Sequence, residues 1–190
     1  MPRPKVVSAS SLKSMAVVAA QELLEDKAEL PSIRQISKRL GVSHVALYRH
    51  FDSLSSLLGE VAELELEGLI RQLARKKSLS GLITGYLTYA TDQPAKYDLI
   101  MSHSNDTIMS WEKIGSLLTM LSSTCARMGL TKASDIQLLW MTLHGAVHLY
   151  RQRMIPARSV SQLASWVQRA VLGMRGVDSD AHDSSQRKCR

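Results

Sequence analysis

The chain has 190 residues, 45% of them hydrophobic and 22% charged, and its formal net charge is +7. This length allows one large domain or two small ones, and the hydrophobic content is sufficient for a core. Two cysteines are too few for a disulfide framework, no apolar run approaches the ~20 residues that span a bilayer, and the basic start lacks the apolar stretch of a signal peptide. We therefore expect a cytoplasmic protein with no membrane partner.

The chain begins with a basic arm over residues 1–9, which contains two prolines and two basic residues. Such arms can lie along phosphates or enter a minor groove, and a disordered start without a role is the alternative. A helix is expected over residues 11–25, where one apolar stripe combines leucines with small alanines. The stripe consists of Leu12, Met15, Ala16, Ala19, Ala20, Leu23 and Leu24. The alanines would let the following helices pack closely.

A helix–turn–helix is expected next, in the stretch IRQISKRLGVSHVALYRHF. Ile33, Ile36 and Leu40 have the i, i+3, i+7 spacing of one helix face. Gly41 suits a left-handed C-cap after that helix, because a residue without Cβ adopts this conformation most easily. Ser32 is positioned to cap the first helix of the pair, and Ser43 suits the N-cap of the helix that follows.

The second helix of the pair covers about residues 44–50 and carries basic side chains beside its apolar ones. Two helices joined by so short a turn cross steeply, which lets the second one project into the major groove of DNA. The motif contains no acid before Asp52 and four basic residues: Arg34, Lys38, Arg39 and Arg49. The acids of the first 51 residues cluster ahead of it: Glu22, Glu25, Asp26 and Glu29. This distribution favours a polyanionic partner.

The stretch GVSHVALYRHF resembles the recognition helix of the TetR family, which commonly reads GVS-x-x-x-LY-x-HF. The resemblance begins near Leu12 and implies a three-helix DNA-binding domain over residues 10–52. Two features depart from the family pattern: Leu24 stands where Phe is common, with no glycine after it, and Leu54 stands where a phosphate-binding Lys is common. A helical hairpin inside an unrelated all-α protein is the alternative.

The resemblance implies that nine residues contact operator DNA: Ser32, Arg34, Ser43, His44, Val45, Ala46, Tyr48, Arg49 and His50. Among these, His44, Val45 and Ala46 are expected to face bases, with the small apolar pair meeting thymine methyl groups. The phosphate contacts are expected from Ser32, Arg34, Ser43, His44 and Tyr48. Lys38, Arg39 and Arg49 could add phosphate charge or remain solvated.

Further helices are expected at residues 53–77, 80–92, 94–104, 106–129, 132–154 and 159–175. No strand-like alternation appears, which predicts an all-α protein. Residues 53–77 would be a connecting helix, and residues 78–176 a helical ligand-binding and dimerisation domain. The polar residues 177–190 are expected to be disordered.

LLWMTLHGAVHLY, which holds Trp140, His144 and Gly145, resembles the Trp…His-Gly pattern of one class of TetR C-terminal domain. Flexible methionines and flat aromatic rings in this half suit a pocket for a small apolar or aromatic effector. The predicted ligand-binding residues are Tyr89, Tyr97, Met101, Trp111, Trp140, Met141 and His144. Ordinary core packing is the alternative for each. His144 and His148 could share a metal ion, but no acid or cysteine lies nearby in sequence, so no metal is predicted.

The last helix carries an apolar stripe that would leave a large exposed patch in a monomer. Paired with the helix that holds Trp140, it could form a four-helix dimer seam. The predicted dimerisation residues are His148, Leu163, Trp166, Val167 and Ala170.

The sequence contains no phosphate-binding glycine loop, nucleophile elbow, HExxH or CxxC motif, so neither an enzyme nor a cofactor is predicted. We expect a homodimeric, ligand-responsive transcriptional regulator that binds a palindromic operator and is released by an effector. Repression is the family default, and activation stays open. The alternatives are a ligand-binding or scaffold protein that has lost DNA binding, and a small helical enzyme.

Overall fold

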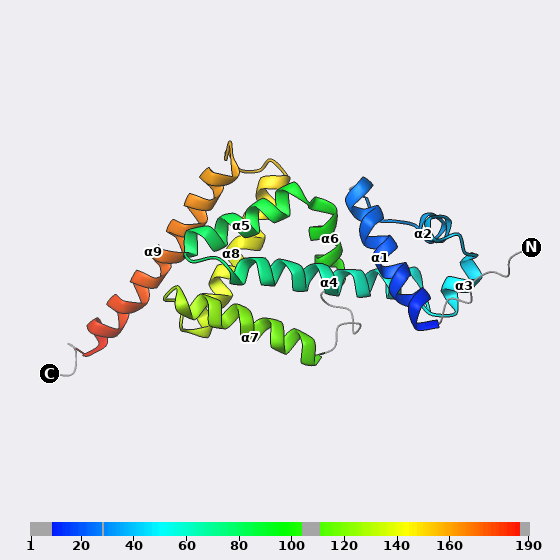
Figure 1. Ribbon diagram of the computed structural model, residues 1–190. Helices are drawn as coiled ribbons and strands as arrows, with labels where there is room; N and C mark the ends of the chain where they lie inside the picture. Colours follow the sequence, from blue (N-terminus) through cyan, green and yellow to red (C-terminus); the bar gives the residue numbers. More distant parts are fainter. Residues whose placement is uncertain (1–8, 28, 104–110, 187–190) are drawn as a thin grey trace, which may run out of the picture. The chain divides into compact units, whose positions relative to one another are not determined.

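The computed structural model describes residues 9–27, 29–103 and 111–186. These residues form helices and no strand (Figure 1), which confirms the predicted all-α class. The helices are α1 (Ala9–Lys27), α2 (Ile33–Leu40), α3 (His44–Tyr48), α4 (Leu54–Ala74), α5 (Leu79–Asp92), α6 (Pro94–His103), α7 (Trp111–Arg127), α8 (Ala133–Arg151) and α9 (Val160–Gln186).

Several helix boundaries differ from the sequence prediction: α4 ends at Ala74 instead of residue 77, and α8 ends at Arg151 instead of residue 154. Helix α3 ends at Tyr48, and His50 closes a turn by donating its backbone N–H to the Leu47 carbonyl at 2.9 Å. Helix α9 continues to Gln186, so the prediction of a disordered tail is wrong for residues 177–186. Extending an existing helix is far easier than starting one, and no proline interrupts this stretch. Residues 1–8 of the predicted arm, and 187–190, lie outside the described residues.

The chain divides into two compact units. The first contains Met1–Gly68 and Gln93–Ile114, and the second contains Leu69–Asp92 and Gly115–Arg190. Helix α6 therefore groups with the helix–turn–helix, whereas residues 94–104 were predicted to belong to the second domain. The physical reason is that Leu99 of α6 joins the core cluster formed by α1 to α4. Helix α4 belongs partly to each unit.

The core of the first unit is built on the alanine stripe of α1. Ala16 and Ala20 are fully buried, and α1 packs against both α2 and α3. Ile36 from α2 and Leu47 from α3 reach the same cluster and are also fully buried. The small alanine side chains leave room for these larger ones, as the sequence predicted.

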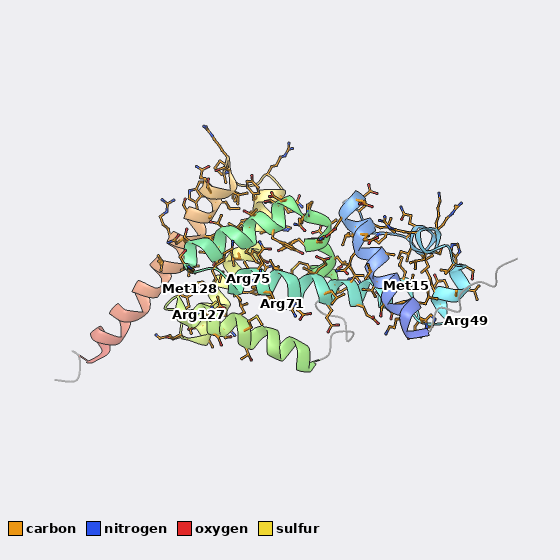
Figure 2. All side chains as sticks on the ribbon, viewed as in Figure 1. Met15, Arg49, Arg71, Arg75, Arg127 and Met128 are labelled. Carbon is orange, nitrogen blue, oxygen red and sulfur yellow. The ribbon has the colours of Figure 1, made fainter. Side chains whose placement is uncertain are left out.

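The second unit is built on α5, α8 and α9, which pack against one another. Its buried apolar residues include Leu82, Ile83, Leu87, Leu139, Leu143, Val147, Leu163, Val167 and Val171. Arg127, at the end of α7, donates from Nη2 to the Ala74 carbonyl at 3.1 Å and so satisfies an acceptor at the end of α4 (Figure 2). No helix in the described part of the chain is long and apolar enough to cross a membrane.

Substituting Leu47→Ala should lower the free energy of unfolding of the first unit by about 3 kcal/mol, because the fully buried side chain leaves a cavity under the recognition helix. Urea unfolding would measure this loss. Val45→Ala, on the same helix but 64% exposed, is the matched control and should change stability by less than about 0.5 kcal/mol. Equal losses for the two variants would contradict the described packing of α3.

Candidate functional site

The turn of the helix–turn–helix is fixed by three local devices that the sequence predicted. Ser32 accepts the Gln35 N–H on its side chain at 3.3 Å, and the Gln35 side chain accepts the Ser32 N–H at 2.7 Å, which completes a capping box at the start of α2. Gly41 ends α2 with a φ of 67°, in the left-handed region. Ser43 caps α3 by accepting the Ala46 N–H at 3.2 Å.

Between these caps and the core, the two sides of α3 differ sharply in exposure. Leu47 is fully buried and Phe51, just beyond the helix, is 3% exposed. On the opposite side, Val45 is 64% exposed and Tyr48 is 50% exposed, although both are large apolar or aromatic side chains. An anchored short helix with an outward face of this kind suits entry into a groove.

The other predicted DNA-binding residues lie at or near this surface. Ser32, Arg34, Ser43, His44 and Arg49 are exposed, while Ala46 and His50 are half-buried. Arg49 follows α3 directly, at the end of the recognition helix (Figure 2). Two of these residues, Ser32 and Ser43, already use their hydroxyl groups as helix caps. Any phosphate contact from them would share an oxygen that accepts a backbone N–H.

The basic residues of the motif fall into two classes. Arg39 is ion-paired with α1: its Nε lies 3.0 Å from a Glu22 oxygen and its Nη1 lies 2.8 Å from an Asp26 oxygen. The hydrogen bond to Asp26 raises the pKa of the Arg39 guanidinium, so it stays charged. The side chains of Arg34, Lys38 and Arg49 have no ion-pair partner within the described ranges. Arg39 is therefore the least suited of the four to bind a phosphate.

At the start of α4, Leu54 stands where the TetR pattern commonly has a lysine. Leu54 is half-buried and packs against the core cluster of the first unit. Ser53 caps the helix, since its hydroxyl accepts the Ser56 N–H at 3.0 Å. The position therefore supplies apolar packing where a lysine would supply charge.

The predicted ligand-binding residues do not all fall in one unit. Tyr97 is buried and Met101 half-buried in the first unit, whereas Tyr89, Trp140, Met141 and His144 belong to the second. Met141 is 71% exposed and Tyr89 is buried, so these two have very different surroundings. The side chain of Trp111 lies outside the described residues. Trp140 and His144 are in direct ring contact.

Trp140 and His144 form an aromatic cluster with a residue that the sequence analysis missed, Tyr86 of α5. The ring centroids of Trp140 and His144 are 4.2 Å apart, and the Tyr86 ring lies 5.6 Å from each, all edge to face. The Tyr86 hydroxyl lies 3.2 Å from both ring nitrogens of His144. The i, i+4 spacing placed Trp140 and His144 together, but only tertiary packing reveals Tyr86.

Burial lowers the pKa of His144 below its usual value. The neutral imidazole then keeps one nitrogen without a proton, and the Tyr86 O–H can donate to it. Trp140 is 37% exposed, whereas Tyr86 is 1% exposed, so the Tyr86 hydroxyl lies in the interior of the second unit and Trp140 reaches its surface. The cluster therefore combines an aromatic face with a neutral hydrogen-bonding pair, which suits an uncharged aromatic molecule. No group of three or more metal-ligating side chains lies together in the described residues.

The predicted dimerisation residues divide into core and surface. Leu163 is 1% exposed and Val167 is 3% exposed within the single chain, because α9 packs on α5 and α8. These two residues therefore belong to the core of the second unit and have almost no surface left for a second chain, which corrects their assignment to the seam. Trp166 and Ala170 are half-buried and His148 is exposed, so these three keep surface available.

The comparisons with known proteins bear on the fold. No family model and no curated protein matches the sequence. Among solved structures, the chain is similar to a TetR transcriptional regulator from Rhodococcus sp. RHA1, with a TM-score of 0.53 and 19% sequence identity. The match covers 84% of this chain and 92% of that one. The chain has the fold of that TetR regulator. An N-terminal helix–turn–helix followed by a helical C-terminal part is thus confirmed, while the Trp…His-Gly resemblance stays a prediction.

The stability of the second unit should fall as the pH drops through about 6.5, the ordinary pKa of histidine, which the unfolded chain adopts. The folded pKa of His144 is lower, so the unfolded state binds the proton first and stability rises with pH in this window. Thermal melts from pH 7.5 to 5 would measure the slope. His144→Gln should flatten it. An identical slope in the native protein and in this variant would contradict the prediction.

Proposed function

We propose that this protein is a DNA-binding transcriptional regulator of the TetR type that reads a palindromic operator as a homodimer. The observation that carries the proposal is the outward face of α3. It presents exposed Val45 and Tyr48 on a capped helix–turn–helix, beside Arg34, Lys38 and Arg49, which form no ion pair with other described residues. Repression, with release by a small effector, is the family's usual mode. A cytoplasmic location would follow from this role.

In this proposal the short apolar side chains of α3 meet base edges, and the residues around it hold the backbone. Val45 and Ala46 would contact thymine methyl groups, while Arg34, Lys38 and Arg49 would neutralise phosphates. The start of α4, capped by Ser53, would offer backbone N–H groups to a phosphate in place of the common lysine.

The direct test is binding of the purified protein to the DNA immediately upstream of its own gene, compared with random duplex of equal length at two salt concentrations. Phosphate contacts weaken steeply with salt, whereas base contacts preserve the preference for one sequence. A preference that survives higher salt would support a specific regulator. Equal, salt-sensitive binding to every upstream fragment and to random DNA would favour the alternative, a ligand-binding or scaffold protein without specific DNA recognition.

Substituting Tyr48→Ala should weaken operator binding about tenfold, which corresponds to about 1.4 kcal/mol, because a hydroxyl within reach of a phosphate is lost. Gel shifts would measure the affinity, and circular dichroism would check that the helices are retained. Met15→Ala is the matched control, since Met15 is 42% exposed but lies on α1. Tyr48→Phe separates the hydroxyl from the ring. Unchanged affinity in Tyr48→Ala would contradict the role given to this residue.

The second unit is proposed to supply the dimer seam from the outer surfaces of α8 and α9. Leu149 of α8 and Leu172 of α9 are 37% and 45% exposed, so both helices keep large apolar side chains at their surface. Trp166, Ala170 and His148 have surface on the same two helices. Two copies pairing through these surfaces would form a four-helix arrangement.

Substituting Trp166→Glu should convert the dimer to a monomer at micromolar concentration, because a charge would be buried without a partner at the seam. Sedimentation velocity would show the change. Leu30→Glu is the control, since Leu30 is 51% exposed in the first unit. A Trp166→Glu protein that still sediments as a dimer would place the seam elsewhere.

The effector is proposed to be a small, uncharged aromatic molecule that stacks on Trp140 and hydrogen-bonds to half-buried His144, whose ring is held by the Tyr86 hydroxyl. Its binding would favour one of two arrangements of the dimer. DNA is released only if the effector binds the arrangement with low DNA affinity more tightly than the other one. Quenching of tryptophan fluorescence by such molecules, lost in Trp140→Leu, is the readout that this role requires.

A further inference from the structure

The acidic end of α1 lies between two cations that come from different helices. On one side, Glu22 and Asp26 pair with Arg39 of α2 at 3.0 and 2.8 Å. On the other side, Glu25 accepts a hydrogen bond from the Lys96 ammonium of α6 at 2.7 Å. The sequence analysis noted this acidic cluster but gave it no role. In the folded protein it connects α6 to α2, the first helix of the DNA-binding motif.

The α6 side of this arrangement is the more buried one. The Lys96 side chain is 12% exposed, and its ammonium also lies 3.4 Å from Glu65 of α4, whose side chain is 10% exposed. Glu65 in turn accepts a hydrogen bond from Gln21 of α1 at 3.1 Å. Three helices therefore meet at a single lysine.

Lys96 is held in its charged form. Burial by itself pulls its pKa down, but the hydrogen bond to Glu25 and the charge of Glu65 outweigh burial, and the pKa lies above its usual value. An uncharged lysine would leave Glu65 buried beside a single amide, and breaking a buried charge pair is costly. The ammonium is therefore the stable partner of both carboxylates.

The remainder of α6 is anchored to the same unit. Leu99 is fully buried in the core cluster with residues of α1 to α4. At the end of α6, the Nε2 of buried His103 lies 3.4 Å from the Ser55 hydroxyl at the start of α4. Because α6 is fixed at its middle and at its C-terminal end, Lys96 contacts α1 from a helix that is held in place.

We propose that the ion pairs of Lys96 and Arg39 with the acidic end of α1 and with Glu65 form an electrostatic bracket. Through this bracket Lys96 sets the position of α2, and with it the position of the recognition helix α3. Lys96 and Arg39 are then positioning residues for DNA binding, and neither contacts a phosphate. The bracket rests on the proposed DNA-binding function only for its effect on affinity. Its structural effect on α2 can be measured without DNA.

The bracket contains two cations and four carboxylates: Lys96 and Arg39 against Glu22, Glu25, Asp26 and Glu65. Without Lys96, Arg39 would be the one remaining cation of the bracket, opposed by all four carboxylates. Three of these carboxylates, Glu22, Glu25 and Asp26, lie within five residues of α1. Their mutual repulsion, no longer balanced from the α6 side, would shift the end of α1 and loosen its pairing with α2. The recognition helix would lose its fixed orientation without losing any DNA contact of its own.

The first measurement is operator affinity over a range of salt concentrations for Lys96→Met and Arg39→Met. Each should weaken binding by roughly 3- to 30-fold, the range of coupling through packed networks, while the slope of log K against log salt stays that of the native protein. Lys38→Met, which removes a proposed phosphate contact, should reduce the slope by about 0.9. Lys77→Met is the control for an exposed lysine outside the bracket and should change neither quantity.

The second measurement needs no DNA. Hydrogen exchange of the α2 amides, residues 33–40, should become at least severalfold faster in Lys96→Met and stay native in Lys77→Met. Lys96→Arg should restore both affinity and protection, because a second cation can reach the same acids. If Lys96→Met fails to fold, the milder Glu25→Gln, whose native side chain is 62% exposed, tests the same contact.

The outcomes separate the bracket from the proposed function. Faster α2 exchange in a protein that binds no DNA would support the bracket and overturn the proposed function. Native exchange and native affinity in both Lys96→Met and Glu25→Gln would overturn the bracket and leave the function standing. A lower salt slope in Lys96→Met would also overturn it, because Lys96 would then be a phosphate contact.

Discussion

The structure of the first unit depends on the close approach of α1 to α2 and α3. The side chains of Ala16 and Ala20 are so short that α2 and α3 can approach α1 closely. Ile36 and Leu47 fill the space between these helices. Leu47 is the only fully buried side chain of the five-residue α3. A helix this short has little stability of its own, so the burial of this residue and the Ser43 cap together determine which of its sides faces outward. The outward face of α3 is thus a consequence of core packing.

Charge has a more specific distribution than the net value of +7 suggests. The four basic residues of the helix–turn–helix look equivalent in sequence, but Arg39 is committed to Glu22 and Asp26. These are exposed pairs, which individually contribute little to stability and are screened by salt. Their importance is geometric, because they join α2 to the acidic end of α1. Lys96 meets that same acidic end from the opposite side, in a more buried setting.

In the second unit, burial decides which of two roles, core packing or contact with a second chain, each residue of an apolar stripe takes. A stripe such as Leu163, Trp166, Val167 and Ala170 can face a core or a second chain. In this fold Leu163 and Val167 face α5 and α8, and the remaining pair keeps surface. The cluster of Tyr86, Trp140 and His144 has a similar origin. One member comes from α5 and two come from α8, and the burial that lowers the pKa of His144 is a property of the packed unit.

By itself, the sequence determined the all-α class, the positions of most helices, the alanine face of α1, and the caps at Ser32, Gly41 and Ser43, since all of these depend on residues close together in the chain. Only the tertiary structure decided that α6 joins the first unit, that Arg39 is paired with α1, and that Tyr86 meets His144. These contacts join residues 13 to 71 positions apart, or follow from how whole helices pack. Side-chain periodicity identifies the buried face of a helix, but the partner that covers this face is fixed only when the chain folds.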